Sequence, residues 1–319
     1  MKNKGGLKSL IFIIVIWLVL FAVLSYLLYD RYLIEEQTFG AFVREDENVS
    51  LFDDEVYDEF PDGMMFYGNL RFADKKITYT VDEECSDSRK ADMFEAFGIL
   101  EEKTVLDFTQ VSDGGQIQAT CSDDFVQPDT KHFIVGEGGP NHIIDNGRYQ
   151  IISNGTILLY TDDDCKNPLV SLHEILHVLG FQHSSNENSV LYSVSNCKQK
   201  FSNDIIDKIN SLYEDPSLPD LVFKDVNVSK KGRYLSFGVT VINKGLVKSG
   251  NTNLSLFYND NELDSFELED FEVGRGKILN VENLKVPRAL NEVVFVIDES
   301  NRVLEIDESN NRVVLSIKN

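Results

Sequence analysis

The sequence predicts an α+β domain followed by an all-β sandwich, with a single membrane-spanning helix before both. Three observations predict this order. An apolar run of membrane-spanning length lies near the N-terminus, helix and strand patterns mix up to residue 213, and short alternating strands separated by turns follow residue 220. A chain of 319 residues is long enough for two domains and a small appendage.

The composition indicates a globular protein with an acidic surface. Hydrophobic residues make up 42% of the chain and aromatic residues 11%, enough to fill real cores despite a net charge of -23. The chain offers no basic patch that would neutralise phosphates, so the charge term in nucleic-acid binding would be repulsive. We therefore expect no nucleic-acid partner.

The first 30 residues are predicted to be a transmembrane anchor or signal-anchor. Leu10 to Tyr29 are apolar or aromatic except for Ser25, which matches the length that crosses about 30 Å of hydrocarbon. Lysines precede this run and acids follow it, so the positive-inside rule places the N-terminus in the cytoplasm and the rest of the chain outside. Secretion after signal cleavage is the alternative, but the bulky run before Asp30 lacks a clean small-x-small cleavage site.

An exposed acidic spacer over residues 31–69 is expected to separate this anchor from the first domain, residues 70–215. Periodicity in that domain predicts a helix over residues 91–103 and strands over residues 76–81, 105–111 and 116–120. The glycine-rich stretch 136–140 is predicted to be a loop. Residues 150–160 are predicted to form a strand, or a hairpin turning at Asn154-Gly155.

Two further helices close the first domain. Asn167-Pro168 is a good helix start, and Gly180 can adopt the left-handed conformation that ends a helix. A second helix is expected over about 203–213, and the proline-rich residues 215–219 form a linker.

The second domain, residues 220–319, has the strand spacing of a β-sandwich, with strands predicted over 221–228, 234–242, 253–258, 292–297 and 312–317. A repeat of Ile-Asp-Glu-Ser-Asn begins at Ile297 and again at Ile306. Its acids are expected to be turn residues, with Ca²⁺ binding as the alternative.

The stretch from His173 to His183 carries the chemistry of the first domain. His173 and His177 are four residues apart on one helix, so both imidazoles project from the same face and can bind one Zn²⁺. Gly180 lets the chain reverse so that His183 can return as the third ligand. Three protein ligands leave the fourth tetrahedral position open, as a catalytic zinc site requires.

Glu174 adjoins the first ligand, where its carboxylate can take a proton from water and pass it to the leaving amine as general base and acid. Zinc supplies the complementary chemistry, since it acidifies water and polarises the scissile carbonyl. The pattern therefore predicts peptide-bond hydrolysis. A chance His-Glu-x-x-His in a helix is the bland alternative, and the added Gly180 and His183 argue against it.

These residues resemble the metzincin metallopeptidases, and more closely their matrixin branch. His183-Ser184 followed by Val190-Leu191-Tyr192 resembles the matrixin Met-turn, with Leu191 at the methionine position and Tyr192 as a substrate-pocket candidate. Residues 77–81 and 201–213 resemble the first strand and the closing helix of that family. The resemblance implies a twisted five-stranded mixed sheet over the zinc helix, with substrate extended along an edge strand. Residues 131–136 are the candidate for that edge.

The sequence departs from matrixins in two further ways. No cysteine precedes Cys85, so the propeptide cysteine that ligates zinc in latent matrixins has no counterpart. Only His132 and His142 are available upstream for a second, structural zinc, and their surroundings do not match that site. We interpret both as ordinary surface or packing histidines.

The four cysteines all lie in the first domain, and an even number outside the cell favours disulfides. We expect Cys165 to pair with Cys197, one before the zinc helix and one after the turn beneath the metal. Cys85 and Cys121 each follow or end a predicted strand and are expected to form the second bridge. A structural zinc is the alternative, although no cysteine pair has the usual short spacing.

The second domain resembles the CARDB family, an immunoglobulin-like module of surface proteins. Asn243-Lys244-Gly245 and the acidic segment from Val296 to Asn311 carry this resemblance. Its expected partner is a cell-envelope or surface ligand, in addition to the membrane and a peptide or protein substrate.

The sequence as a whole predicts a membrane-anchored, extracytoplasmic zinc endopeptidase with one catalytic Zn²⁺. The rival hypothesis is a cell-surface adhesion protein whose peptidase-like domain is weak or inactive, which Leu191 and the sandwich would favour. Retention of Glu174 favours the enzyme, because a zinc site that only binds needs no carboxylate beside its ligand.

Overall fold

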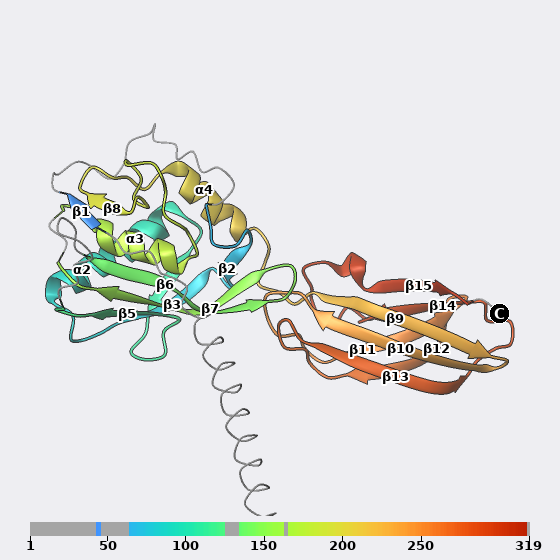
Figure 1. Cartoon of the computed structure of the whole chain (residues 1–319). Coiled ribbons are helices and arrows are strands. Elements are labelled where there is room, and N and C mark those ends of the chain that lie inside the picture. The colour runs from blue at the N-terminus through green and yellow to red at the C-terminus, as the bar shows by residue number, and fades with distance from the viewer. Residues whose placement is uncertain (1–42, 46–63, 125–133, 163–164, 318–319) are drawn as a thin grey trace, which may run out of the picture. The chain divides into compact units, whose positions relative to one another are not determined.

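The computed structural model describes residues 43–45, 64–124, 134–162 and 165–317 (Figure 1). The predicted membrane segment, Leu10 to Tyr29, lies outside these ranges. Within them, no helix is both long enough and apolar enough to cross a bilayer.

A mixed sheet organises the first domain, with five strands in the order β2-β7-β5-β3-β4 and a sixth, β6, paired with β7 (Figure 1). Only the β6–β7 pairing is antiparallel. The resemblance implied five strands, and the sheet has six. The sequence-based prediction did not include β2, which has three residues and is too short to show an alternating pattern. The strands are β2 (Leu70–Phe72), β3 (Lys76–Val81), β4 (Asp107–Gln110), β5 (Ile117–Cys121), β6 (Gly136–Asp145) and β7 (Gln150–Leu159).

Strands β6 and β7 correct two sequence-based predictions. The stretch 136–140 is the first half of β6 and not a loop, and β7 runs through Asn154-Gly155 without a turn. Gly155 serves close packing, because a Cβ there would lie 2.6 Å from Val178 Cγ1. The range predicted for the edge strand, residues 131–136, also differs from the structure. Residues 131–133 lie outside the described ranges, and the described edge strand begins at Gly136.

Three helices belong to the first domain: α2 (Asp87–Lys103), α3 (Leu169–Val178) and α4 (Asn203–Leu212). α2 begins four residues before the predicted start, because the Ser86 side chain accepts a hydrogen bond from the Arg89 amide and caps the helix. The helix expected from Asn167-Pro168 begins at Leu169, within the one or two residues by which helix ends vary. Gly180 follows α3 with φ of +98°, the left-handed conformation predicted for it.

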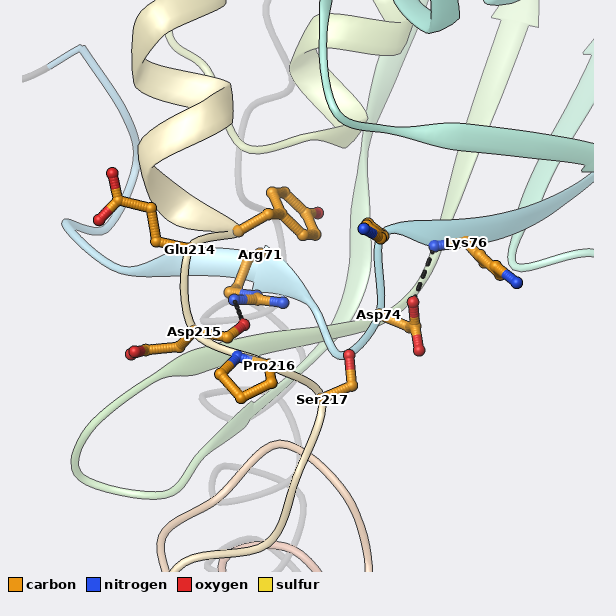
Figure 2. A pocket seen from close by; sticks show the side chains of 9 residues that line it. Arg71, Asp74, Lys76, Glu214, Asp215, Pro216 and Ser217 are labelled. Carbon is orange, nitrogen blue, oxygen red and sulfur yellow. Dashed lines mark hydrogen bonds between the residues drawn. The ribbon is translucent and has the colours of Figure 1, made fainter. Parts of the chain in front are cut away.

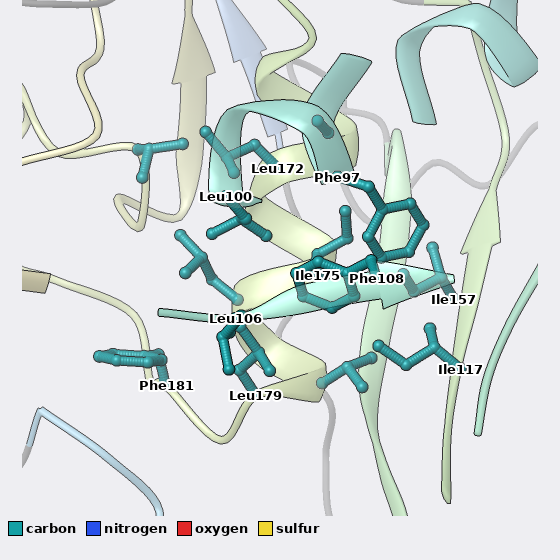
Figure 3. Packing of buried hydrophobic residues seen from close by; sticks show 14 of the residues in the cluster. Phe97, Leu100, Leu106, Phe108, Ile117, Ile157, Leu172, Ile175, Leu179 and Phe181 are labelled. Carbon is teal, nitrogen blue, oxygen red and sulfur yellow. The ribbon is translucent and has the colours of Figure 1, made fainter. Parts of the chain in front are cut away.

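The core of the first domain lies between the sheet and the helices α2 and α3. α3 packs against β6, β7 and α2, and all ten of its residues are buried. Figure 3 shows Phe97 and Leu100 of α2 meeting Leu172 and Ile175 of α3 close to the sheet. Burying each such side chain contributes roughly 1.5 to 3 kcal/mol, so this packing holds α3 firmly in place.

Part of the predicted spacer packs on the first domain. Met65 forms a backbone bridge with Phe181, and the Phe66 amide donates to the Gly180 carbonyl at 2.9 Å. Further upstream, β1 (Val43–Glu45) pairs in parallel with β8 (Val194–Asn196). Residues 64–66 are therefore in contact with the chain just after α3.

The second domain is a sandwich of two antiparallel sheets, β13-β10-β9 and β12-β11-β14-β15. All five predicted strands are present, and the sequence-based prediction missed β12 and β13, in which Leu268 is the one buried residue. Phe237 packs edge-to-face on Phe266 and Phe295 in the core. The elements are β9 (Leu221–Lys231), β10 (Tyr234–Asn243), β11 (Thr252–Tyr258), β12 (Asn261–Leu268), β13 (Gly276–Lys285), β14 (Glu292–Ile297), the 3₁₀ turn η1 (Glu308–Asn310) and β15 (Arg312–Ser316).

Candidate metal centre and catalytic site

Three histidines converge at the C-terminal end of α3. His173 and His177 lie one helical turn apart, and their Nε2 atoms are 2.8 Å from each other. The reversal at Gly180 returns His183, whose Nε2 is 3.3 Å from that of His173. One nitrogen from each ring lies within 4.8 Å of the other two. The structure thus brings together the three side chains that the sequence nominated as metal ligands.

Backbone carbonyls orient two of these rings. Nδ1 of His173 donates to the Val190 carbonyl at 2.6 Å, and Nδ1 of His177 donates to the Phe181 carbonyl at 2.7 Å. A proton on Nδ1 leaves the Nε2 lone pair free and aimed at the centre of the cluster. This outer layer of hydrogen bonds is the usual way in which proteins set the tautomer of a metal-binding histidine.

Burial keeps the imidazoles in the neutral form that a metal requires. Desolvation lowers the pKa of His173 well below its ordinary value, and the neighbouring charges of His177 and His183 lower it further. Desolvation also lowers the pKa of His177 to about 4, and it lowers the pKa of His183. Three neutral nitrogen donors in a buried cluster fit a zinc ion.

Glu174 lies beside the cluster with its side chain fully buried. Neither carboxylate oxygen has a hydrogen-bond partner among the described residues, which is costly for a buried polar group unless water, substrate or a metal completes the site. Burial raises the pKa of Glu174 well above its usual range, and the charge of Glu137 raises it further. An orphaned carboxyl next to three converging histidines is a suitable proton acceptor and donor.

Strand β6 covers Glu174, a contact that the sequence-based prediction missed. A Cβ at Gly136 would lie 2.8 Å from Glu174 Oε1, and a Cβ at Gly138 would lie 2.5 Å from the Glu174 carbonyl oxygen. Glycine at both positions therefore lets the strand backbone approach α3 closely. The sequence signal was present in Gly136-Glu137-Gly138, but glycine-rich stretches more often form loops.

The turn predicted at Leu191 is hydrogen-bonded to His173 of α3 through Val190. Val190 supplies the carbonyl that orients His173, and the Leu191 carbonyl accepts from the Ser184 amide at 2.8 Å. Leu191 is fully buried, whereas Tyr192 is half-buried and forms a backbone bridge with Ser184. The chain thus passes from the third histidine to this turn and back under the cluster.

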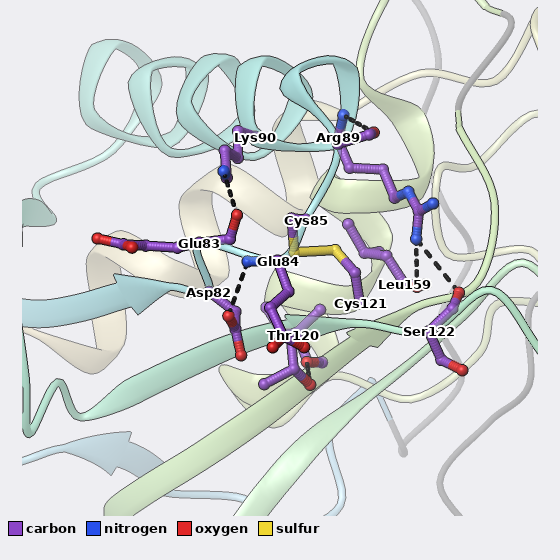
Figure 4. The surroundings of a disulfide bond; sticks show 12 residues. Asp82, Glu83, Glu84, Cys85, Arg89, Lys90, Thr120, Cys121, Ser122 and Leu159 are labelled. Atoms are coloured by element: carbon purple, nitrogen blue, oxygen red, sulfur yellow. Dashed lines mark hydrogen bonds between the residues drawn. A yellow bond between two sulfur atoms is a disulfide. The ribbon is translucent and has the colours of Figure 1, made fainter.

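Both predicted disulfides are present. Cys165 pairs with Cys197, which ties the segment before α3 to the segment after β8. Cys85 pairs with Cys121 and joins the loop after β3 to the end of β5, and these strands are neighbours in the sheet. Figure 4 shows this second bridge beneath α2, where Arg89 donates to the carbonyls of Ser122 and Leu159. The two bridges brace the sheet and the walls of the site.

Among the described residues, His142 and the acids of the sandwich are not part of the histidine cluster. His142 is exposed on β6 with Nδ1 3.1 Å from Ser153 Oγ, and His132 lies outside the described residues. In the sandwich, the Asp298 carboxylate accepts from the Val303 amide, and Asp307 caps η1 by accepting from the Ser309 amide. These acids of the two Ile-Asp-Glu-Ser-Asn segments therefore serve a turn and a helix cap, as the turn interpretation expects.

Family models match both domains: the matrixin model over residues 71–214 and the CARDB model over residues 218–314. A search of curated proteins found no match. Among solved structures, myroilysin is 14% identical, covering 56% of this chain and 93% of its own with a TM-score of 0.29. High choriolytic enzyme 1, a hatching enzyme zinc-protease from the medaka fish Oryzias latipes, is 18% identical, covering 35% of this chain and 46% of its own with a TM-score of 0.23.

The CARDB domain of the PF1109 protein from Pyrococcus furiosus, in complex with di-metal ions, is 19% identical, covering 32% of this chain and 90% of its own with a TM-score of 0.27. The two family matches leave only residues 215–217 between them, which agrees with the linker that separates the mixed domain from the sandwich. Residues 71–214 of this chain are therefore a matrixin domain, and residues 218–314 are a CARDB domain.

Proposed function

We propose that this chain is a zinc-dependent endopeptidase whose catalytic domain lies outside the cytoplasm, held to a membrane by its N-terminal segment. The observation that carries the catalytic part is the convergence of His173, His177 and His183 beside the buried, unpartnered carboxyl of Glu174. The membrane part rests on the apolar run from Leu10 to Tyr29 and the lysines before it.

Each residue of the site has a separate role in this proposal. The three histidines hold the zinc ion through Nε2, and the carbonyls of Val190 and Phe181 keep two of them in the required tautomer. When bound, zinc acts as a Lewis acid that acidifies water and polarises the scissile carbonyl. Glu174 accepts the proton of the attacking water and delivers it to the nitrogen of the leaving amine.

Strand β6 is the proposed docking edge for substrate. It pairs with β7 on one side, and no other described strand pairs with its second edge. An extended peptide can add to such an edge through main-chain hydrogen bonds. The glycines at positions 136 and 138 keep this edge against Glu174, so a peptide docked there lies next to the catalytic carboxyl.

The adhesion alternative places the main activity in the sandwich. The CARDB domain supports a surface or cell-envelope ligand as an additional partner, with Ca²⁺ as a further candidate ligand of its acidic segments. It gives no reason for Glu174 to be retained beside the histidines. We therefore assign hydrolysis to the matrixin domain and leave ligand binding as a separate property of the sandwich.

The deciding experiment replaces Glu174 by glutamine in the full chain. Glu174→Gln should abolish cleavage of a diverse peptide mixture and leave the zinc content unchanged, because the side chain handles protons and is not a ligand. Cut sites are mapped by mass spectrometry, and zinc is measured by elemental analysis. The control is Glu95→Gln, which makes the same chemical change at an exposed glutamate on α2, away from the site. This variant should keep wild-type cleavage.

Substantial hydrolysis by Glu174→Gln would contradict the role of Glu174 as general base and acid. A wild-type chain that binds zinc and cleaves no peptide would favour the adhesion alternative.

A further inference from the structure

Strand β6 reaches from the catalytic helix to the sandwich. Its first residues, Gly136 and Gly138, lie against Glu174. Its last residues lead into the turn 146–149, which joins β6 to β7 and contacts the CARDB domain. One strand thus has the catalytic carboxyl at one end and the second domain at the other.

Asn146 links this turn to the sandwich, and its side-chain amide donates two hydrogen bonds and accepts two. Its Nδ2 donates to the carbonyls of Lys244 and Gly245 at 2.9 and 2.7 Å. Its Oδ1 accepts from the amides of Arg148 and Tyr149 at 2.9 and 2.7 Å, within the turn itself. The side chain is 6% exposed, and its hydrogen bonds to Gly245 and Tyr149 are buried.

Charged and phenolic groups reinforce the same junction. Arg148 Nη1 is 2.9 Å from Asp220 Oδ2 of the sandwich, and Nη2 is 3.2 Å from Asp215 Oδ2 of the linker. The hydroxyl of Tyr149 donates to the Asp215 carboxylate. Asp220 is almost fully buried, so Arg148 is the partner of a carboxylate that solvent barely reaches.

An apolar cluster fills the space beneath these polar contacts. Tyr149 and Ile151 of the first domain pack with Leu246 of the sandwich, and all three are buried. Partly buried side chains from both domains complete the cluster: Ala73, Ile144, Val273 and Ile306. Buried apolar packing of this kind is typical of a fixed domain contact.

The linker is also held in place. The buried Arg71 side chain lies over the ring of Tyr213 and donates to the carbonyls of Leu212 and Asp215. Ser217 Oγ donates to the Ala73 carbonyl at 2.9 Å. Figure 2 shows Arg71 beside Asp215 of the linker. Both residues line a pocket of about 420 Å³. The sequence predicted a simple connecting linker, whereas these bonds pin it to β2.

We propose that the CARDB sandwich positions strand β6 for catalysis, with Asn146 and Arg148 as the positioning residues. Pairing of β6 with β7 is irregular between Pro140 and Ile143, so the ladder alone holds the strand less firmly than an uninterrupted one. Contacts at both ends therefore contribute to fixing the strand against Glu174. This inference rests on the proposed function, because it assigns substrate to the β6 edge.

The test uses Asn146→Asp in the full chain. This substitution replaces the side-chain NH2 group by an oxygen and hardly changes the side-chain volume. The remaining oxygen can still accept from Arg148 and Tyr149, whereas the second carboxylate oxygen faces the carbonyls of Lys244 and Gly245 and repels them. Asn280→Asp is the matched control, since it makes the same charge change at an exposed position on β13.

Two readouts are measured on each protein. Amide hydrogen exchange over residues 136–145 should become faster in Asn146→Asp and stay at the wild-type rate in Asn280→Asp. For a peptide substrate, KM should rise about tenfold with a smaller change in kcat, because displacement of the docking strand weakens binding of the docked peptide and leaves the catalytic groups in place. Zinc content should be unchanged in both variants.

Arg148→Lys provides a second variant should Asn146→Asp fail to fold, because it keeps a positive charge beside the buried Asp220 and loses the forked contact that reaches both Asp215 and Asp220. It is expected to change exchange and KM in the same direction. Unchanged exchange over residues 136–145 together with unchanged KM in a folded variant overturns the proposal, as does an equal effect in Asn280→Asp. Failure of the proposed function is seen separately, as a wild-type chain without hydrolysis; the exchange comparison then still decides whether the sandwich holds β6.

Discussion

At the scale of single residues, Leu191 is where this chain departs from the matrixin pattern inside the site itself. In the family that it resembles, the methionine at this position is not bonded to zinc and forms an apolar floor under the imidazoles. Leu191 is fully buried, and its neighbour Val190 orients His173. Leucine and methionine have similar volumes, so the same floor can be built from either side chain.

Leu191→Met should leave peptide cleavage nearly unchanged, because exchanges of this kind usually cost less than about 1.5 kcal/mol. Leu191→Ala should open a cavity under the ligands, lower the free energy of unfolding by about 2 to 5 kcal/mol and weaken zinc binding. Cleavage rates, zinc affinity and denaturant unfolding of both variants test this. If the wild type is inactive with zinc bound and Leu191→Met restores cleavage, then Leu191 is the cause of the lost activity. That result would favour the adhesion alternative.

Glu305 in the sandwich is a buried carboxyl with a perturbed pKa. Its carboxylate accepts from the Leu221 amide and from Asn311 Nδ2. Burial raises the pKa of Glu305 to about 7, and the charges of Glu308 and Asp220 raise it further while the two hydrogen bonds oppose the shift. The folded state therefore holds the proton more tightly than the unfolded chain, whose glutamate pKa is near 4.5.

The stability that this group contributes is fully present below about pH 4.5 and is lost as pH rises toward 7. The expected loss is on the order of 1 to 3 kcal/mol, allowing for solvent screening of a group that is not wholly enclosed. Thermal unfolding of the wild type and Glu305→Gln at pH 5 and 7.5 measures it. Glutamine cannot titrate, so its pH dependence should be flatter, while the exposed Glu292→Gln should follow the wild type. Equal slopes for Glu305→Gln and wild type would contradict the assignment.

At the scale of elements, helix α3 packs against strands β6 and β7, whose backbones approach it closely. Glycines at positions 136, 138 and 155 allow this, because a Cβ at each would meet α3 at less than 3.0 Å. The disulfide from Cys165 to Cys197 then ties the segment before the helix to the segment after β8. The close approach places β6 directly over Glu174, so these glycines serve packing at the site.

Gly155→Ala should destabilise the first domain by about 1 to 3 kcal/mol, the usual range for overpacking in a dense core. The added methyl group would lie 2.6 Å from Val178 Cγ1 and 2.8 Å from the Gly139 carbonyl oxygen, and the latter belongs to backbone that cannot rotate away. Gly98→Ala is the control, because it lies exposed in α2 with open space around it and should stabilise by about 0.5 to 1 kcal/mol. Urea unfolding measures the change in the free energy of unfolding for each variant, which should be opposite in sign. An unchanged free energy for Gly155→Ala would show that the strand can move away from α3 at no cost.

At the scale of the whole molecule, the chain combines a predicted anchor, a matrixin domain and a CARDB domain. The structure joins the last two through contacts at Asn146, Arg148 and Leu246. A peptidase and a surface module held in this way would act as one unit on the outer side of a membrane. That location is a proposal that rests on residues 1–30 alone.

The full chain should sediment with membranes and keep its N-terminal residues, since the run from Leu10 to Tyr29 is long enough to span the bilayer. A chain that begins after residue 30 should be released as a soluble protein. Fractionation followed by intact-mass measurement distinguishes the outcomes. A soluble mature protein that lacks the first 30 residues would establish secretion after cleavage and refute the retained anchor.

Sequence alone determined the parts of this protein whose signals are local. The spacing of His173, His177 and His183 follows from the helical repeat and one reversal at Gly180, so the spacing of these residues is enough to predict the cluster. Both cysteine pairs and five sandwich strands were also predicted correctly, because strand alternation and cysteine position are visible in short windows.

Only the tertiary structure decided which segments meet across long distances in the chain. The stretch 136–140 has loop composition, yet it pairs with β7 and covers Glu174, because glycine there permits a contact that no local pattern records. Asn146 and Arg148 have ordinary turn composition, and their partners at Lys244, Gly245 and Asp220 lie more than 70 residues away. Packing between distant segments depends on shape and on desolvated hydrogen bonds, and neither is encoded in the periodicity of a single segment.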